Sequence, residues 1–366
     1  MARLGDIATY VNGYAFKPTD WSDNGVPIIR IQDLTGSSYQ SNRYNGEYAL
    51  KYEVNCGDVL ISWSASLGVY IWSGEKAVLN QHIFKVVFDK VKVNKSFFVH
   101  QVKNILEKAS SEAHGATMKH LTKPIFDSLP FYLPSMEEQE KIASVLDKIN
   151  MLIFNREQQL SKLDELVKSR FIELFGAWNS NPKPLKSFLK DITYGFTNPM
   201  PDAEEGPWKI TAKDVVNGKV NYDTARKTTV QAFEKLTAKS KPTVGDVLLT
   251  KDGTLGRCAV VEENGMCVNQ SVAVLKCNEK ILPKFLAILL QMPEYQGEML
   301  KNAGGGTIKH IYITKVVDMM VIVPDISQQL DFLTFVEQTD KSKLVIQQSL
   351  EQLETLKKSL MQHYFG

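Results

Sequence analysis

The spacing of hydrophobic residues predicts one long helix from Ser135 to about Phe175. Apolar side chains recur there in alternating steps of four and three, which is typical of a coiled-coil seam. Ser135 and Glu138 form a capping pair at the predicted start. A helix of about 40 residues is roughly 60 Å long, so it needs a packing partner. The seam consists of Ile142, Leu146, Ile149, Ile153, Leu160, Leu163, Val167 and Leu174, with Arg156 and Arg170 interrupting it.

A second helix with the same pattern is predicted after Pro324. Asp325 and Gln328 repeat the capping pair, and most positions 190 residues after the first seam are again apolar or aromatic. Two such helices, each closing a globular stretch, indicate an internal duplication. If they pair in antiparallel fashion, the chain acquires pseudo-twofold symmetry. The second seam consists of Phe332, Val336, Thr339, Lys343, Ile346, Leu350, Leu353, Lys357, Leu360 and Tyr364.

The segments before the two helices share motifs in the same order. The offset between the copies rises from 181 to 190, so the second copy has gained residues, chiefly between Asp214 and Gly245. We therefore predict an α+β protein with globular domains at residues 1–134 and 183–324. Spacer helices, packed as an antiparallel coiled coil, occupy residues 135–182 (with a linker) and 325–366. The repeated motifs are Gly57-Asp58-Val59-Leu60 with Gly245-Asp246-Val247-Leu248, Asn80-Gln81 with Asn269-Gln270, and Gly115-Ala-Thr117-Met-Lys119-His120 with Gly305-Gly-Thr307-Ile-Lys309-His310.

Composition narrows the class of protein. With 366 residues, 43% of them hydrophobic, the chain can bury more than one core. Its four cysteines form no Cys-x-x-Cys pair or zinc-type spacing, which predicts reduced, mostly buried thiols and a cytoplasmic location. The start of the chain has no signal-peptide pattern, and no run of 18 apolar residues occurs, so no membrane partner is expected.

The charges are distributed unevenly. Residues 1–134 hold 14 Lys+Arg against 12 Asp+Glu and residues 183–324 hold 19 against 15, whereas both helical segments are slightly acidic. This weak basic bias is compatible with DNA but smaller than that of a stand-alone basic DNA binder. A P-loop, a His-Glu-x-x-His motif, a nuclease-type acidic-x-Lys motif and an Asn-Pro-Pro-aromatic motif are all missing from the sequence. We expect no catalytic residue, metal site or cofactor in this chain.

The repeated motifs, in this order, resemble the specificity subunit of type I restriction-modification systems. The strongest likeness is Pro-Ser-Met-Glu-Glu-Gln139-Glu-Lys-Ile-Ala, and the resemblance covers essentially all 366 residues. It implies two target recognition domains that recognise the halves of a bipartite, asymmetric sequence in double-stranded DNA. It also implies that the helices act as a spacer and as a dock for methyltransferase subunits. Restriction (translocase) subunits are a further partner that the resemblance leaves open, and S-adenosylmethionine and ATP would bind to the partners.

Polar residues in the predicted strands and loops are the candidates for DNA contact, because their side chains can hydrogen-bond to phosphates or base edges. Arg30 and Gln32, like Thr211 and Lys213, are expected on one side of a strand. Each candidate has an alternative role as a solvated side chain or turn former. The candidates are Arg30, Gln32, Ser62, Ser64, Lys119 and His120 for the first half-site, and Thr211, Lys213, Lys251, Asp252, Thr254, Lys309 and His310 for the second.

Two other functions stay open from the residues alone. The modest charge would also suit a coiled-coil scaffold whose two globular domains bind proteins. A self-sufficient DNA enzyme is the third interpretation, and the missing catalytic motifs disfavour it.

Overall fold

The computed structural model describes residues 2–37, 42–112, 122–176, 182–304 and 309–366. The chain forms two compact units: unit 1 comprises Met1–Gln158 and Gln347–Gly366, and unit 2 comprises Gln159–Ile346. The division falls within both long helices, whereas the sequence placed domain boundaries at the helix ends. The reason is that each helix contributes side chains to two cores: Val167 and Phe171 are buried in unit 2, while Ile142 and Leu146 are buried in unit 1.

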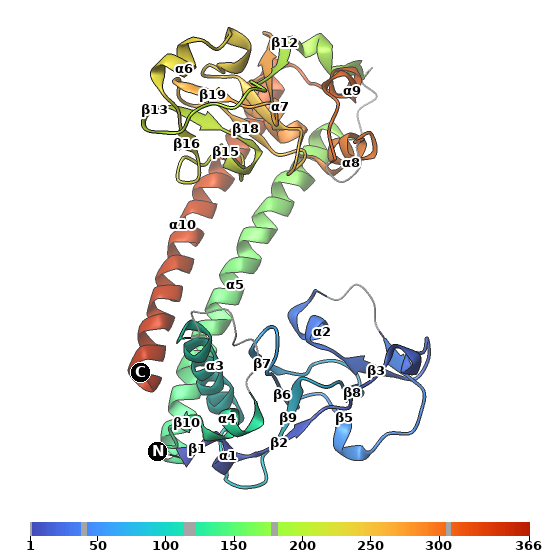
Figure 1. Ribbon diagram of the computed structural model, residues 1–366. Coiled ribbons are helices and arrows are strands. Elements are labelled where there is room, and N and C mark those ends of the chain that lie inside the picture. Colours follow the sequence, from blue (N-terminus) through green and yellow to red (C-terminus); the bar gives the residue numbers. More distant parts are fainter. Residues whose placement is uncertain (1, 38–41, 113–121, 177–181, 305–308) are drawn as a thin grey trace. The chain divides into compact units, whose positions relative to one another are not determined.

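Unit 1 is built on two four-stranded sheets (Figure 1). One has the strand order β2-β9-β6-β7 and the other β4-β3-β8-β5, in which β3 and β8 are parallel. The strands are β1 (Ala2–Arg3), β2 (Thr9–Asn12), β3 (Val26–Ile29), β4 (Arg43–Tyr44), β5 (Glu53–Val54), β6 (Val59–Ser62), β7 (Gly68–Ile71), β8 (Ala77–Leu79), β9 (Ile83–Val87) and β10 (Pro130–Phe131). The helices are α1 (Leu4–Ile7), α2 (Ile31–Thr35), α3 (Lys95–Glu112), α4 (Lys123–Ser128) and the first part of α5 (Met136–Phe175).

Unit 2 repeats this plan with sheets β12-β20-β17-β18 and β16-β13-β19, in which β13 and β19 are parallel. Its strands are β11 (Lys183–Pro184), β12 (Leu189–Tyr194), β13 (Ala203–Ile210), β14 (Val215–Val216), β15 (Lys219–Val220), β16 (Arg226–Lys227), β17 (Val247–Thr250), β18 (Cys258–Val260), β19 (Met266–Val268), β20 (Val272–Cys277) and β21 (Met320–Val321). Its helices are α6 (Val230–Glu234), α7 (Pro283–Leu289), α8 (Pro293–Lys301), α9 (Ile313–Asp318) and the first part of α10 (Ile326–Phe365), with short 3-10 turns η3 (Leu185–Phe188), η4 (Ala212–Asp214) and η5 (Ala238–Ser240).

The two units agree in detail as well as in topology. Gly13 follows β2 and Gly195 follows β12, and each lies directly against backbone. A Cβ atom would stand 2.0 Å from the Asn80 carbonyl oxygen in unit 1 and 1.7 Å from that of Val268 in unit 2. The next residue bridges to Asn80 or Asn269 in parallel fashion. The predicted internal repeat is therefore confirmed.

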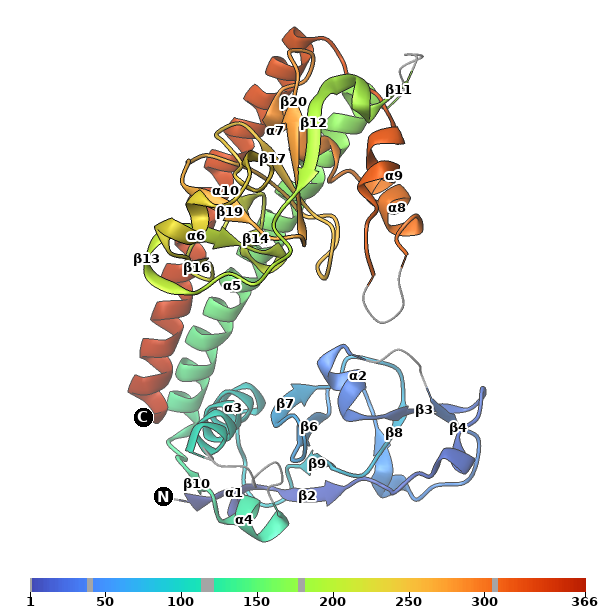
Figure 2. The same cartoon turned by 45° about the horizontal axis from the view of Figure 1, so that its top comes forward.

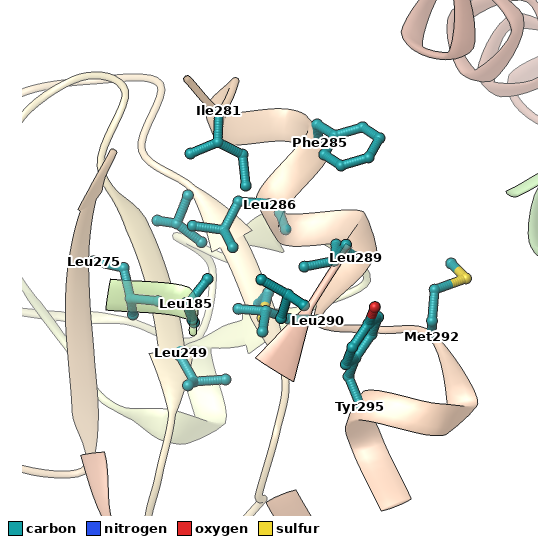
Figure 3. Close-up of a cluster of buried hydrophobic side chains, with 14 of the residues drawn as sticks. Leu185, Leu249, Leu275, Ile281, Phe285, Leu286, Leu289, Leu290, Met292 and Tyr295 are labelled. Carbon is teal, nitrogen blue, oxygen red and sulfur yellow. The ribbon is translucent and has the colours of Figure 1, made fainter. Parts of the chain in front are cut away.

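We call β12-β20-β17-β18 the main sheet of unit 2 and β2-β9-β6-β7 the main sheet of unit 1. A helix covers one face of the main sheet in unit 2 (Figure 3). Leu286 and Leu289 of α7, and Leu290 directly after it, are buried with Leu249 of β17 and Leu275 of β20. In unit 1, α3 supplies Phe97, Phe98 and Val102 to the corresponding core. Helix α8 begins at Pro293 and extends this part of unit 2.

Both predicted long helices form, and every predicted seam position is buried or half-buried. In unit 1 the end of α10 packs near the beginning of α5, since Leu360 and Tyr364 pack against a core that contains Ile142. In unit 2 the beginning of α10 meets the end of α5, where the Phe332 ring lies 5.7 Å from that of Phe175. The helices are thus antiparallel within each unit.

A buried glutamine fixes the start of each long helix. Gln139 Nε2 donates to the Pro134 carbonyl (2.9 Å) while its Oε1 accepts from the backbone N–H of Asn94 (2.9 Å). Gln329 makes the same pair of bonds to Pro324 (2.8 Å) and Leu282 (2.8 Å). The glutamine is thus present at the start of both helices, and its role is to join each helix to its own globular part.

Candidate nucleic-acid interface

The loops that carry most candidate residues leave the same end of each main sheet. In unit 2, β12 ends at Tyr194 opposite Ala273, and β17 ends at Thr250 opposite Val272. In unit 1, β2 ends at Asn12 opposite Phe84, and β6 ends at Ser62 opposite Ile83. We call this the loop end of each unit. Because the strands pair in the same register, equivalent loops occupy equivalent places in the two units.

Three of the predicted residues meet at the loop end of unit 2. Asp252 accepts a hydrogen bond from His310 Nδ1 (2.6 Å) with one carboxylate oxygen and from Lys251 Nζ (2.8 Å) with the other. The same lysine nitrogen lies 5.5 Å from the centre of the Tyr194 ring. The backbone N–H of Ile311 donates to the Lys251 carbonyl (2.8 Å), which holds the segment before α9 against the β17–β18 loop.

This cluster presents several kinds of polar group. The side chains of Lys251 and Asp252 are each 16% exposed, whereas that of His310 is 44% exposed. An ionised carboxylate can only accept hydrogen bonds, so Nδ1 of His310 carries a proton and Nε2 is the atom left for an external partner. Asp252 therefore positions the side chains of Lys251 and His310, and His310 is the most accessible member.

The other predicted residues of unit 2 differ in exposure. Lys213 and Lys309 are exposed and form no ion pair within the described ranges. Thr254 is exposed but donates to the Ala212 carbonyl (3.2 Å). Thr211 is half-buried and donates to Asp214 Oδ2 (2.7 Å). Lys213, Thr254 and Lys309 are consequently the candidates whose side chains are open to a ligand.

The corresponding loop of unit 1 has different chemistry. Trp63 stands where unit 2 has Lys251, and its Nε1 donates to Asn12 Oδ1 (3.1 Å) while its ring lies 4.9 Å from that of His82. The predicted residues Ser62 and Ser64 are buried, at 0% and 5% exposure. The Ser62 hydroxyl donates to the Ser66 carbonyl inside the loop. Neither serine is on the surface as expected: both are buried, and the Ser62 hydroxyl is bonded within its own loop.

Arg30 and Gln32 lie in a helical turn instead of a strand, so the predicted alternation of side chains is wrong there. Strand β3 ends at Ile29, and Asp33 Oδ2 accepts from the Arg30 backbone N–H (2.8 Å), which begins α2. The Arg30 side chain is half-buried near Asp33, whereas Gln32 is exposed.

The equivalent strand prediction in unit 2 is wrong for the same reason. Strand β13 ends at Ile210, and Asp214 Oδ2 accepts from the Thr211 backbone N–H (2.9 Å), which begins η4 and places Lys213 in that turn. The aspartate repeated three residues after each cap was the signal of a helix start that the alternation argument overlooked. Lys119 and His120 lie outside the described residues.

Several repeated motifs form the framework of these loops. Gly57 and Gly245 have φ of 89° and 90°, a left-handed turn conformation that suits glycine. The following aspartates accept from the backbone N–H of Asn55 or Thr243 (2.9 Å each). They also pair with Lys85 (3.3 Å) and Lys276 (3.0 Å). Residues with distinctive chemistry that the sequence argument missed are Asn12, Trp63, His82 and Tyr194.

Other kinds of site were also sought. Across the described ranges no group of three or more His, Cys, Asp and Glu side chains is arranged to hold a metal ion. No helix within those ranges is both long and apolar enough to cross a membrane. All four cysteines are free, and burial raises the pKa of Cys258 to about 12 and that of Cys267 to about 11. These two buried thiols are therefore poor nucleophiles.

Comparison with known proteins identifies the family. The family described as "Type I restriction modification DNA specificity domain" matches residues 1–165 and 182–355. The chain belongs to this family. The two matched ranges correspond to the two copies of the internal repeat.

Individual relatives agree with this assignment. The EcoBI specificity subunit of Escherichia coli is 25% identical over 403 residues, covering 99% of this chain and 84% of the relative. The MjaVIII specificity subunit of Methanocaldococcus jannaschii is 22% identical, covering 99% and 90%. The predicted resemblance and the function as a type I specificity subunit are thus confirmed, in preference to a general protein-binding scaffold.

Solved structures share the fold. A chain from a type I system, solved to explain complex assembly and conformational transition, matches with a TM-score of 0.59 and 14% identity over 100% of this chain and 96% of its own length. The specificity subunit from M. genitalium matches with a TM-score of 0.53 and 12% identity over 98% and 94%. The predicted α+β fold with an internal repeat is confirmed.

Proposed function

We propose that this specificity subunit recognises a bipartite, asymmetric sequence in double-stranded DNA, one half with each unit, and leaves catalysis to its partners. The observation that carries the proposal is the combination of a shared framework with different loop chemistry. Equivalent positions hold Trp63 in unit 1 and Lys251 in unit 2, on loops with the same strand register. Two units with the same framework and different loop side chains suit a DNA target whose two halves differ in sequence.

The contacts in unit 2 would come from the cluster at its loop end. Lysine and histidine donate to guanine acceptors or phosphates, and a carboxylate accepts from the cytosine amino group. Lys251, Asp252 and His310 therefore supply donors and an acceptor within one small area, and Lys213, Thr254 and Lys309 lie exposed in the neighbouring segments. In unit 1 the exposed Gln32 and the half-buried Arg30 are the described candidates, with Lys119 and His120 proposed from their correspondence to Lys309 and His310.

Methyltransferase subunits would dock on the long helices. Within unit 1, α5 exposes Met151, Leu152 and Phe154 at 63%, 47% and 57%. Within unit 2, α10 exposes Leu344 and Val345 at 56% and 65%. Large apolar side chains gathered on exposed helix surfaces favour a protein partner. S-adenosylmethionine and ATP would then bind to methyltransferase and restriction subunits in the cytoplasm, where free thiols persist.

A map of methylated bases in cells with and without this chain tests the proposal. We expect a two-part motif that disappears on deletion and returns when the chain is supplied again. Methylation that is unchanged by deletion would refute the role in target choice. Methyl transfer by the purified single chain would refute the division of labour between this subunit and its partners.

A further inference from the structure

The segment of unit 2 that has no equally long counterpart in unit 1 is strongly basic. We call residues 215–244, between Asp214 and Gly245, the basic segment. It holds six Lys+Arg against two Asp+Glu, which equals the whole basic excess of residues 183–324. The rest of that globular stretch is electrically balanced. Its basic residues are Lys219, Arg226, Lys227, Lys235, Lys239 and Lys241.

The counterpart in unit 1 lacks this charge. Residues 34–56 lie between the equivalent Asp33 and Gly57 and hold two Lys+Arg against two Asp+Glu. Arg43 is engaged with Glu75 (2.7 Å) and with the Gly25 carbonyl (2.6 Å). Lys51 lies 4.9 Å from the centre of the Tyr52 ring. The difference between the units is therefore a local gain of positive charge in unit 2.

Three lysines of the basic segment are available to an external anion. Lys219, Lys235 and Lys239 are exposed and form no ion pair with any residue that the structure describes. In contrast, Arg226 pairs with Asp202 (2.9 Å), and Lys227 lies 4.7 Å from the centre of the Trp208 ring. Lys219, Lys235 and Lys239 can therefore bind an anion without first breaking an ion pair within the described residues.

The basic segment adjoins the loop end of unit 2. The Lys239 carbonyl accepts from the Thr193 hydroxyl (3.0 Å), one residue before Tyr194 in the Lys251 cluster. Gly218, next to Lys219, bridges to Ala259, just after the β17–β18 loop, and Arg257 from that region donates to the Val215 carbonyl (3.5 Å). Figures 1 and 2 show α6 and β16 on one flank of the unit, with α8 and α9 on the other.

We propose that the basic segment is a binding surface for the phosphodiester backbone of duplex DNA beside the bases recognised at the loop end, a charge that the sequence of residues 34–56 in unit 1 does not supply. The inference rests on the proposed function of the loop end. Exposed lysines act as point charges on phosphates, and each phosphate that they neutralise releases counterions. Unit 2 therefore provides more of the sequence-independent affinity for DNA. This affinity keeps the complex bound to the duplex while the loop ends of both units contact the bases.

The test compares two triple variants of the full chain, each assembled with its methyltransferase subunits. The first is Lys219→Ala/Lys235→Ala/Lys239→Ala. The control is Lys183→Ala/Lys190→Ala/Lys280→Ala, which removes three exposed lysines of unit 2 near the opposite end of its main sheet, where Leu189 pairs with Cys277. Affinity for a fluorescent duplex of arbitrary sequence is measured over a range of salt concentrations, together with the methylated motif of each variant.

The affinity constant K falls as salt rises, so the slope of log K against log salt is negative. We expect the first variant to make this slope less steep by about three units, because each lost phosphate contact removes about one unit. The control should keep the wild-type slope, and both should keep the wild-type motif, since backbone contacts carry no sequence information. An unchanged slope in the first variant, or equal losses in both, would overturn the inference. A wild-type complex that showed no salt-dependent binding to duplex DNA would instead refute the proposed function.

Discussion

Units 1 and 2 have the same framework and present different surfaces. In both, a buried hydroxyl on the last residue of β6 or β17 closes the loop that follows: Ser62 donates to the Ser66 carbonyl and Thr250 to the Thr254 carbonyl. One residue further on, Trp63 meets Asn12 whereas Lys251 meets Tyr194 and Asp252. Repetition in the sequence thus identifies residues that hold the loop, and divergence identifies residues that can recognise DNA.

The largest effects should come from the glycines where backbone meets backbone. Gly13→Ala and Gly195→Ala would each place Cβ 2.0 Å or less from a carbonyl oxygen on the neighbouring segment, and because that oxygen belongs to the backbone, the main chain itself would have to shift. We expect each substitution to destabilise its unit by about 3 kcal/mol or more. Thermal unfolding would measure the loss.

Gly297→Ala is the matched control, because its Cβ would meet nothing within 4 Å and alanine favours the α8 helix. It should leave stability unchanged or raise it slightly. A tolerated Gly13→Ala beside a damaging Gly195→Ala would show that the two units do not share this close approach.

The next effect concerns recognition. Asp252→Asn keeps the size of the side chain but removes the charge that holds Lys251 and His310. We expect methylation to lose discrimination at one half-site by about 1–3 kcal/mol, and the other half-site to be unaffected. Methylation rates on duplexes altered in one half at a time would measure this loss.

Ser64→Ala is the comparison in unit 1, because Ser64 stands at the equivalent position but is buried. It should leave discrimination at both half-sites unchanged. If Asp252→Asn altered both halves equally, the separation of recognition between the units would be wrong.

The sequence revealed the framework more fully than the site. The seam of each long helix repeats over about 40 residues, so a few exceptions such as Arg156 do not hide it. Four or five residues near Arg30 or Thr211 carry too little pattern to separate a strand from a helical turn. Burial of Ser62 and Ser64 depends on the three-dimensional packing around them, which sequence spacing does not encode.

Contacts between residues that are far apart in the sequence were only partly predictable. His310 and Asp252 were both candidates, but their contact arises because the segment before α9 pairs with the β17–β18 loop. The sequence did not indicate that Tyr194 and Asn12 are equivalent, since one side chain is aromatic and the other is an amide. They end the corresponding strands β12 and β2. Only the shared register shows that they are equivalent positions.

A smaller effect tests the shape of the two loops. Ala65 has φ of 60° and Gly253, at the equivalent position, has φ of 80° with open space around it. Left-handed backbone costs a residue with Cβ roughly 1–2 kcal/mol, which the lower entropy of its unfolded state partly offsets. We therefore expect Gly253→Ala to lower stability by about 1 kcal/mol and Ala65→Gly to change it in the opposite direction, as urea unfolding would show. Changes of the same sign would mean that the turns differ.

The smallest expected effect appears only in weak acid and concerns a difference between the cores. His100 of α3 stands where α7 has Ile288, and its Nε2 lies 2.7 Å from Asp147 Oδ1. Burial lowers the pKa of His100 below its usual value, and Lys357 and Lys103 act in the same direction, although Asp147 opposes them. The unfolded chain, with a histidine pKa near 6.5, then binds the proton more readily than the folded chain. Stability of unit 1 should consequently fall as the pH drops through about 6.5 towards the lower folded-state pKa.

His100→Ile, which copies unit 2, should weaken this dependence in urea unfolding measured at a series of pH values. If the wild-type protein became more stable over that range, Asp147 would outweigh burial at this site.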